Sequence, residues 1–162
     1  MQDYVVELRE SVERATPALL ALGEETSGEP LAPGKWSPRE IIGHLIDSAS
    51  VNHQRFVRAQ FQDDLVFSGY AQEDWVRVQG YRDAPWGELV GLWRSYNLHV
   101  ARVMAAVPEE IRERRHSRHN LHQIALRAVP EGEPTTLDYL MRDYVLHLKS
   151  HLRQILGEMN LS

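Results

Sequence analysis

Two histidines near the C-terminal end of the chain stand four residues apart, in the segment DYVLHLKSHLRQI. If this segment is helical, His147 and His151 lie one turn apart on one face, where both imidazoles can bind the same metal ion. An HxxxH pair alone is a weak signal, because the chain has 8 histidines. The same face carries Leu140 and Tyr144, so it should point inward. Buried imidazoles need polar partners, and one metal ion would satisfy both.

A second polar stripe lies in the segment WSPREIIGHLIDSASVNHQRF. His44, Ser48, Asn52 and Arg55 recur there at spacings of three and four, which places them along one face of a helix. Two interpretations stay open at this point. The stripe lines a wet or metal-filled cavity, or it is a polar face exposed to solvent, since the opposite side of the helix is also mixed.

The chain contains no cysteine, which excludes disulfides, zinc–thiolate sites, iron–sulfur clusters and a cysteine nucleophile. Any thiol used in its chemistry must therefore come from outside the chain. The sequence also lacks a Gly-rich phosphate loop, a G-x-S-x-G elbow and an HExxH motif. Nucleotide hydrolases, serine hydrolases and zincin proteases consequently have no support.

Amphipathic segments must position these residues. Apolar side chains over residues 3–23 alternate at spacings of three and four, which predicts a helix, and the proline- and glycine-rich residues 24–35 predict a loop. A second helix is predicted from Ser37 to about Phe61, since Ser37 and Glu40 can form a capping box.

The later elements follow in order: a crossover over residues 62–83 with a short helix around Glu73–Val78, a third helix opened by Pro85 and ending before Pro108, a charged segment over 108–134, and a last helix from Thr135 or Thr136. No segment alternates with the period of two that a strand needs. We therefore expect an all-α fold, a four-helix bundle with two long connections, forming a single domain over residues 1–162.

The composition agrees with a compact domain: 162 residues, 43% hydrophobic and 25% charged, with a net charge of −5. The N-terminus resembles neither a signal peptide nor a transit peptide, and no apolar run approaches the roughly 20 residues that span a membrane. We expect a soluble, cytoplasmic protein without a membrane role. The mild acidity argues against nucleic-acid binding and leaves a small molecule as the expected substrate.

A competing histidine cluster lies in the segment RRHSRHNLHQ. His116, His119 and His122 stand three apart, but neighbouring arginines would repel a cation, and the run is typical of a solvated segment. Two interpretations of the arginines stay open: they bind an anionic thiol cosubstrate, or they form an ordinary charged surface, which is the usual case; they are Arg112, Arg114, Arg115 and Arg118.

The chain resembles a known family in four segments, which follow in order: LRESVERATPALLAL, GKWSPREIIGHLIDSASVNHQRFVRA, YAQEDW and LHLKSHLRQI. They are similar to the DinB/YfiT-like superfamily of metalloenzymes, and most of all to the YfiT branch, which includes bacillithiol S-transferases. The most specific likeness is the pattern H-x-x-D-S-x-x-x-N-x-x-R-F, matched at His44, Asp47, Ser48, Asn52, Arg55 and Phe56.

The resemblance implies a bundle with up-down-down-up connectivity and a divalent metal, zinc or nickel, held by His44, His147 and His151. It also favours a homodimer. Three neutral imidazoles would leave the ion an open coordination position, as in catalytic rather than structural sites. Such an ion would lower the pKa of a bound water or thiol.

Three hypotheses for function follow. The first is transfer of a low-molecular-weight, bacillithiol-like thiol to an electrophile; the second is hydrolysis by a metal-bound water; the third is a non-enzymatic, metal-binding, stress-associated bundle. No catalytic residue is assigned. Residues expected to orient the imidazoles or contact the substrate are Asp47, Ser48, Asn52, Arg55, Asp143 and Tyr144. Of these, Asp143 is more typical of an ordinary surface group.

Overall fold

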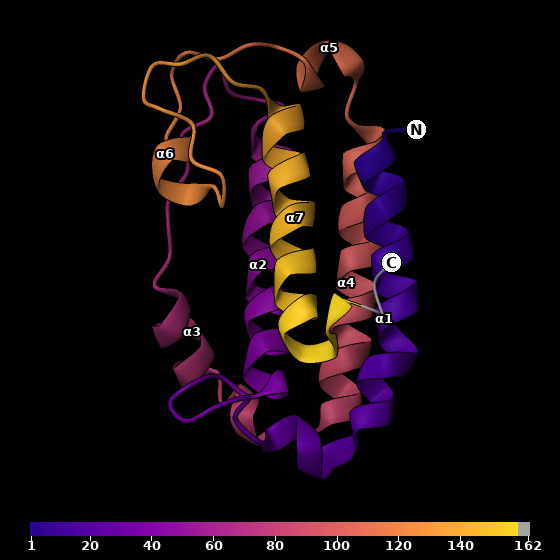
Figure 1. The fold of residues 1–162 in the computed structure, drawn as a ribbon. Helices are drawn as coiled ribbons and strands as arrows, with labels where there is room; N and C mark the ends of the chain where they lie inside the picture. The colour runs from indigo at the N-terminus through magenta and orange to yellow at the C-terminus, as the bar shows by residue number, and fades with distance from the viewer. Residues whose placement is uncertain (159–162) are drawn as a thin grey trace.

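The computed structural model describes residues 1–158, which form four long helices and several short ones (Figure 1). The long helices are α1 (Asp3–Gly28), α2 (Pro38–Arg58), α4 (Trp86–Ala106) and α7 (Leu137–Leu156). The short ones are α3 (Gln72–Val78), the 3-10 helix η1 (Tyr81–Asp83), α5 (Glu109–Arg112) and α6 (Leu121–Ile124). The predicted all-α four-helix bundle is confirmed. None of the helices in the described part is long and apolar enough to cross a membrane.

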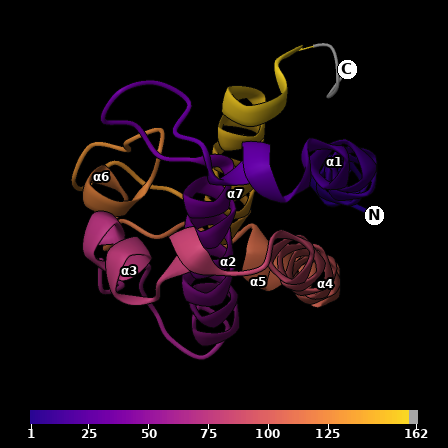
Figure 2. The same cartoon turned by 90° about the horizontal axis from the view of Figure 1, so that it is seen from below.

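The four long helices have the connectivity that the resemblance implied. In Figure 1, α1 runs down from the N-terminus, α2 and α4 run up, and α7 runs down. The crossover that carries α3 and η1 returns the chain from the top of α2 to the bottom of α4, while α5 and α6 lie on the connection to α7. Seen from below in Figure 2, α4 packs between α1 and α2, and α7 contacts α1 and α2.

Local capping explains where α2 and α7 begin. The Ser37 hydroxyl accepts a hydrogen bond from the Glu40 N–H at 3.3 Å, and the Glu40 carboxylate accepts one from the Ser37 N–H at 2.8 Å. The Thr136 hydroxyl accepts the Tyr139 N–H at 3.1 Å and begins α7. These bonds satisfy donors that a helix start otherwise leaves free, so the predicted starts are confirmed.

The predicted loop over residues 24–35 is wrong in its first part, because α1 continues to Gly28 after a kink at Gly23. Gly23 has a φ of 75°, a left-handed conformation that glycine adopts without strain. Arg39 of α2 holds the piece beyond the kink, since its guanidinium donates to the Glu24 carbonyl at 2.5 Å and to the Ser27 hydroxyl at 3.1 Å. This tertiary contact extends the helix past the local break.

Gly43 allows the crossover to pack directly on α2. A Cβ at this position would lie 2.2 Å from the Tyr81 ring, so only glycine lets the ring approach. The Tyr81 hydroxyl then donates to the buried Asp47 carboxylate at 2.7 Å. The close approach therefore fixes η1 against the part of α2 that follows His44.

The predicted solvated segment around residue 116 is wrong for two of its histidines. His116 and His119 are 6% and 5% exposed, and they donate to the backbone carbonyls of Asp63 at 3.1 Å and Glu133 at 2.8 Å. The crossover backbone passes beside them, because Leu65 pairs with His119. Since these partners come from distant segments, the local sequence pattern could not reveal the burial.

Candidate metal centre

Three histidines from two helices meet between α2 and α7. The Nε2 atoms of His44 and His147 lie 3.2 Å apart, and His44, His147 and His151 each offer a ring nitrogen within 4.8 Å of the others. His44 is fully buried, whereas His147 and His151 are half-buried. In the part of the chain that the structure describes, no other group of three His, Asp or Glu side chains meets in this way.

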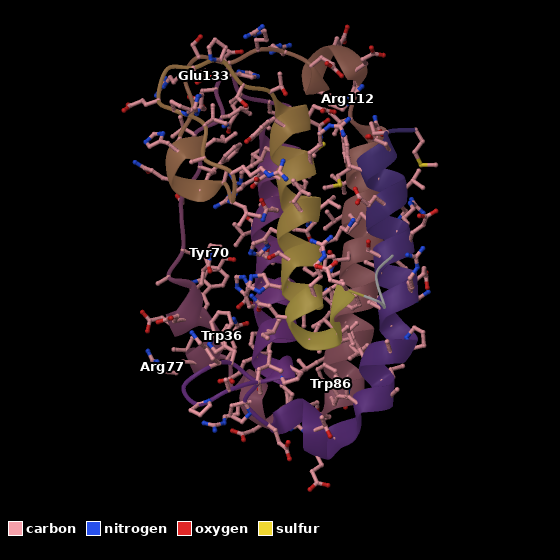
Figure 3. The ribbon with its side chains drawn as sticks, viewed as in Figure 1. Trp36, Tyr70, Arg77, Trp86, Arg112 and Glu133 are labelled. Atoms are coloured by element: carbon pink, nitrogen blue, oxygen red, sulfur yellow. The ribbon has the colours of Figure 1, made fainter. Side chains whose placement is uncertain are left out.

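Side chains around the three histidines fix how the rings are turned. The Gln154 side-chain oxygen lies 3.1 Å from Nδ1 of His151; because this oxygen only accepts, it holds the proton on Nδ1 and leaves the Nε2 lone pair free. The Trp36 ring packs against His44 with centroids 5.2 Å apart. Figure 3 shows Trp36 and Tyr70 on the side of the bundle that faces α3. Sequence reasoning missed Gln154, although it stands one turn after His151.

Burial keeps all three imidazoles neutral near pH 7. Burial, with a smaller contribution from the proximity of His151, lowers the pKa of His44 to about 4 and that of His147 to about 3. Burial also lowers the pKa of His151. A neutral imidazole has the free lone pair that a metal ligand needs, so no proton has to be displaced before an ion binds.

The positions of the ring nitrogens fit a divalent ion. In tetrahedral zinc sites with Zn–N bonds of about 2.0–2.1 Å, neighbouring nitrogens lie about 3.3 Å apart, close to the 3.2 Å between His44 and His147. Nε2 is the His44 nitrogen that faces His147 and would bind the ion, whereas Nδ1 is buried without a hydrogen-bond partner among the described residues, so no hydrogen bond there fixes the tautomer of this ring. A donor set of three imidazole nitrogens suits zinc, nickel, copper and iron alike and leaves positions open for a further ligand.

A cavity of about 360 Å³ opens beside His147 and His151. Its lining comes from α2, the crossover, the loop around α6 and α7: Ser48, Asn52, Arg55, Gly69, Tyr70, Gln72, Gln123, Ile124, Ala125, Leu126, Leu140, Asp143, Tyr144, His147 and His151. The predicted stripe of His44, Ser48, Asn52 and Arg55 is buried, with 0 to 8% exposure. The structure thus favours the cavity interpretation over an exposed polar face.

The remaining candidates from the sequence bond to groups other than the imidazoles. Asp47 accepts from Gln79 and Tyr81, both at 2.7 Å, and Tyr144 donates to the Asn97 side chain at 2.5 Å. Asp143 is 5% exposed rather than on the surface, and its two oxygens accept the N–H groups of Leu126 and Arg127 at 2.7 and 2.8 Å. Asp143 therefore fastens one wall of the cavity to α7.

Three polar residues of the cavity were missed by the sequence reasoning: Tyr70, which precedes α3, Gln72, which begins α3, and Gln123 of α6. No periodicity marks them, because a loop has no regular face and helices as short as α3 and α6 are too short to show one. Burial, together with the negative charge of Asp47, raises the pKa of Tyr70 to about 12. Its hydroxyl therefore stays protonated near pH 7 and can donate a hydrogen bond into the cavity.

The fold and the site together define a four-helix bundle with a candidate three-histidine metal centre beside an open cavity. A sequence model described as DinB superfamily matches residues 7–155, and the chain belongs to this superfamily. The solved structure of YfiT from Bacillus subtilis superposes with a TM-score of 0.76 at 18% identity, over 94% of this chain and 81% of that one. YfiT is described as a probable metal-dependent hydrolase with an unusual four-helix bundle topology. None of the curated proteins compared with the chain matches it.

The lowered histidine pKa values predict that the metal-free chain loses stability on acidification. Unfolded histidines take up protons below about pH 6.5, whereas folded His44 and His147 resist protonation down to about pH 4 and about pH 3. In this window the unfolded state binds more protons than the folded state. The free energy of unfolding therefore decreases as the pH is lowered, by up to about 1.4 kcal/mol per pH unit for each histidine. Urea unfolding of the metal-free chain at pH 7 and pH 5 measures the slope.

The comparison uses a variant in which both His44 and His147 are replaced by glutamine. Carboxylates that titrate in the same range remain in this variant, so the difference between the two slopes belongs to the histidines. We expect a shallower slope for the variant. Equal slopes would show that these imidazoles do not resist protonation in the fold.

Proposed function

We propose that His44, His147 and His151 hold a divalent ion, zinc or nickel, in a metal-dependent enzyme that transfers a low-molecular-weight thiol to an electrophile. The observation that carries the proposal is the cluster of three neutral imidazoles at the wall of an open polar cavity. The lack of cysteine adds a constraint, since a reacting sulfur must arrive as a cosubstrate. A bacillithiol-like thiol is the cosubstrate that we propose.

When bound, the ion would supply Lewis acidity that lowers the pKa of a thiol. The chain's own residues would bind and orient the reactants. Burial keeps the histidines neutral, and Gln154 holds His151 in one tautomer. The Asp143 carboxylate binds the backbone N–H groups of residues 126 and 127 and so attaches this loop to α7. The protonated Tyr70 hydroxyl would donate to an acceptor atom of a bound molecule.

The reaction balances without an oxidant or reductant. The sulfur of the thiol forms a bond to an electrophilic carbon, while the bond from that carbon to its leaving group breaks and the leaving group takes the electron pair. The proton of the thiol passes to solvent, which reaches the half-buried His147 and His151.

The test incubates the metal-loaded chain with an alkylating electrophile such as monochlorobimane, with and without bacillithiol, and measures the fluorescent thioether. We expect turnover that requires both thiol and metal. The nonenzymatic rate, and the rate with chain that has been stripped of metal by a chelator, are the references. Thiol consumption no faster than the nonenzymatic rate for bacillithiol, mycothiol and glutathione would reject thiol transfer.

Metal-dependent hydrolysis is the second candidate, favoured by the description of YfiT as a probable metal-dependent hydrolase. The same donor set and open cavity suit the activation of water. A model ester or amide that is cleaved by the metal-loaded chain without any thiol would support this candidate. If neither reaction occurs, the third candidate, a non-enzymatic metal-binding bundle, is favoured.

A homodimer remains a proposal beside the function. Apolar side chains stand exposed on α2 and α4 and just beyond α2, including Val57, Phe61 and Leu92, which are 37%, 86% and 52% exposed. Burying such residues against a second copy would remove apolar area from water. Sedimentation of the purified chain measures its oligomeric state.

A further inference from the structure

Arg55 is a buried cation without an acidic partner. Its side chain is 6% exposed, and its guanidinium donates to the Ser68 carbonyl at 2.9 Å and the Asn52 side-chain oxygen at 3.4 Å. Its Nε has no hydrogen-bond partner among the described residues. Within residues 1–158, none of the ion pairs includes Arg55. Burying a charge in this way is costly unless an opposite charge joins it.

Three of the four arginines over residues 112–118 already have acidic partners. Arg112 pairs with Asp138 at 2.5 Å, Arg114 with Asp63 at 3.9 Å, and Arg118 with Asp64 at 3.5 Å. These contacts weaken the sequence-based idea that this arginine cluster binds an anionic cosubstrate. Arg55 is different because its charge is buried, has no acidic partner among the described residues and lies in the lining of the cavity.

Arg55 lines the same cavity as His147 and His151. The one carboxylate in that lining, Asp143, is already engaged, since each of its oxygens accepts a backbone N–H. Tyr70, also in the lining, keeps its hydroxyl proton and adds a second donor. The cavity thus has the histidines in one part and unpaired positive charge with donors in another.

We propose that Arg55 binds a carboxylate, or an oxyanion of similar geometry, on the small molecule whose other end reacts at the three histidines. The planar guanidinium matches such a group because two of its N–H donors can bind two oxygens at once. The inference rests on the proposed function, since it treats the cavity as the substrate site. It names the substrate class as an anionic small molecule.

The separation between the histidines and Arg55 also sets a minimum length for a ligand that contacts both. His44 and Arg55 are eleven positions apart on α2, which corresponds to about 16 Å along the helix axis. A molecule that contacts both parts must be extended, with its reactive group and its anionic group at opposite ends. A single small ion would occupy only the Arg55 part.

The test uses succinate and its uncharged analogue succinamide, titrated into the metal-free chain at pH 7.5 with calorimetry or amide chemical shifts. The three histidines are neutral at this pH, so they do not attract the anion. We expect succinate to bind at least tenfold more tightly than succinamide, and Arg55→Gln to weaken succinate binding at least tenfold. Arg94→Gln, which removes an exposed ion pair with Glu13, is the control and should bind succinate like the wild type.

Inorganic phosphate is titrated in parallel, and its binding through Arg55 would show a general oxyanion site. Because the Arg55 side chain also holds the Ser68 carbonyl, Arg55→Lys serves as a second variant that keeps the charge and loses the planar fork. Succinate should raise the melting temperature of the wild type and not that of Arg55→Gln, which a merely structural arginine would not explain. Equal affinity for succinate and succinamide, or equal succinate affinity in Arg55→Gln, overturns the inference.

This outcome is separable from that of the proposed function, because the titration needs neither metal nor thiol. Succinate binding through Arg55 in a chain that binds no metal would leave the anion site standing without the enzyme proposal. Conversely, a chain that turns over the thiol but does not bind succinate would refute the Arg55 inference alone.

Discussion

Replacing His147 by alanine is expected to leave the chain without bound metal, whereas wild-type chain purified without an affinity tag should carry about one divalent ion per chain. His147 is in contact with both other rings, with centroids 5.1 Å from His44 and 4.6 Å from His151. Without it, one imidazole on each helix remains, and two ligands hold an ion poorly. Losing an outer partner of a ligand already weakens metal binding about 10- to 100-fold, so losing a ligand should cost more.

Elemental analysis of the purified chains measures the metal content directly. His99→Ala is the matched control, because His99 is a half-buried histidine on α4 that faces the His53 ring of α2 and lies outside the three-histidine cluster. It should retain the metal. A metal-free wild type, or a His147→Ala chain with unchanged metal content, would refute the metal centre.

The elements that position this site are predictable where their determinants are local. The Ser37 and Glu40 capping box and the Thr136 cap lie within one turn of the helix ends that they fix, so the sequence shows both partners. The spacing of His147 and His151 is equally local, since α7 keeps both on one face. The sequence also indicates the break of α1 at Gly23. The helical turn that follows the break depends on hydrogen bonds from Arg39, sixteen positions further along the chain.

The apposition of His44 with the other two histidines could not be derived from periodicity. It depends on how α2 packs against α7, and more than a hundred residues separate the partners. The family resemblance supplied that pairing. Burial of His116, His119 and Asp143 was missed for a similar reason, because their partners are backbone groups of irregular segments. Such segments carry no repeating pattern from which contact can be read.

Removing the metal is expected to leave the helices intact while lowering the stability of the chain. The buried apolar residues of α2 and α7 belong to one continuous core with α1 and α4, so the helices have packing partners that do not involve the ion. Both helices also begin at their own caps. The far-ultraviolet circular dichroism should therefore stay the same after treatment with a chelator. Returning the ion to 100 times its dissociation constant should raise the free energy of unfolding by about 2.7 kcal/mol.

His44→Ala tests whether that gain comes from the three-histidine centre. We expect this variant to keep its helical circular dichroism and to gain little stability from added metal, because the ligand from α2 is missing. His53→Ala, on the same helix but outside the cluster, should gain as much as the wild type. An ion that stabilises His44→Ala fully would have to bind elsewhere. Loss of helical signal from the stripped wild type would make the centre structural, since the ion would then build the fold instead of joining helices that are already packed.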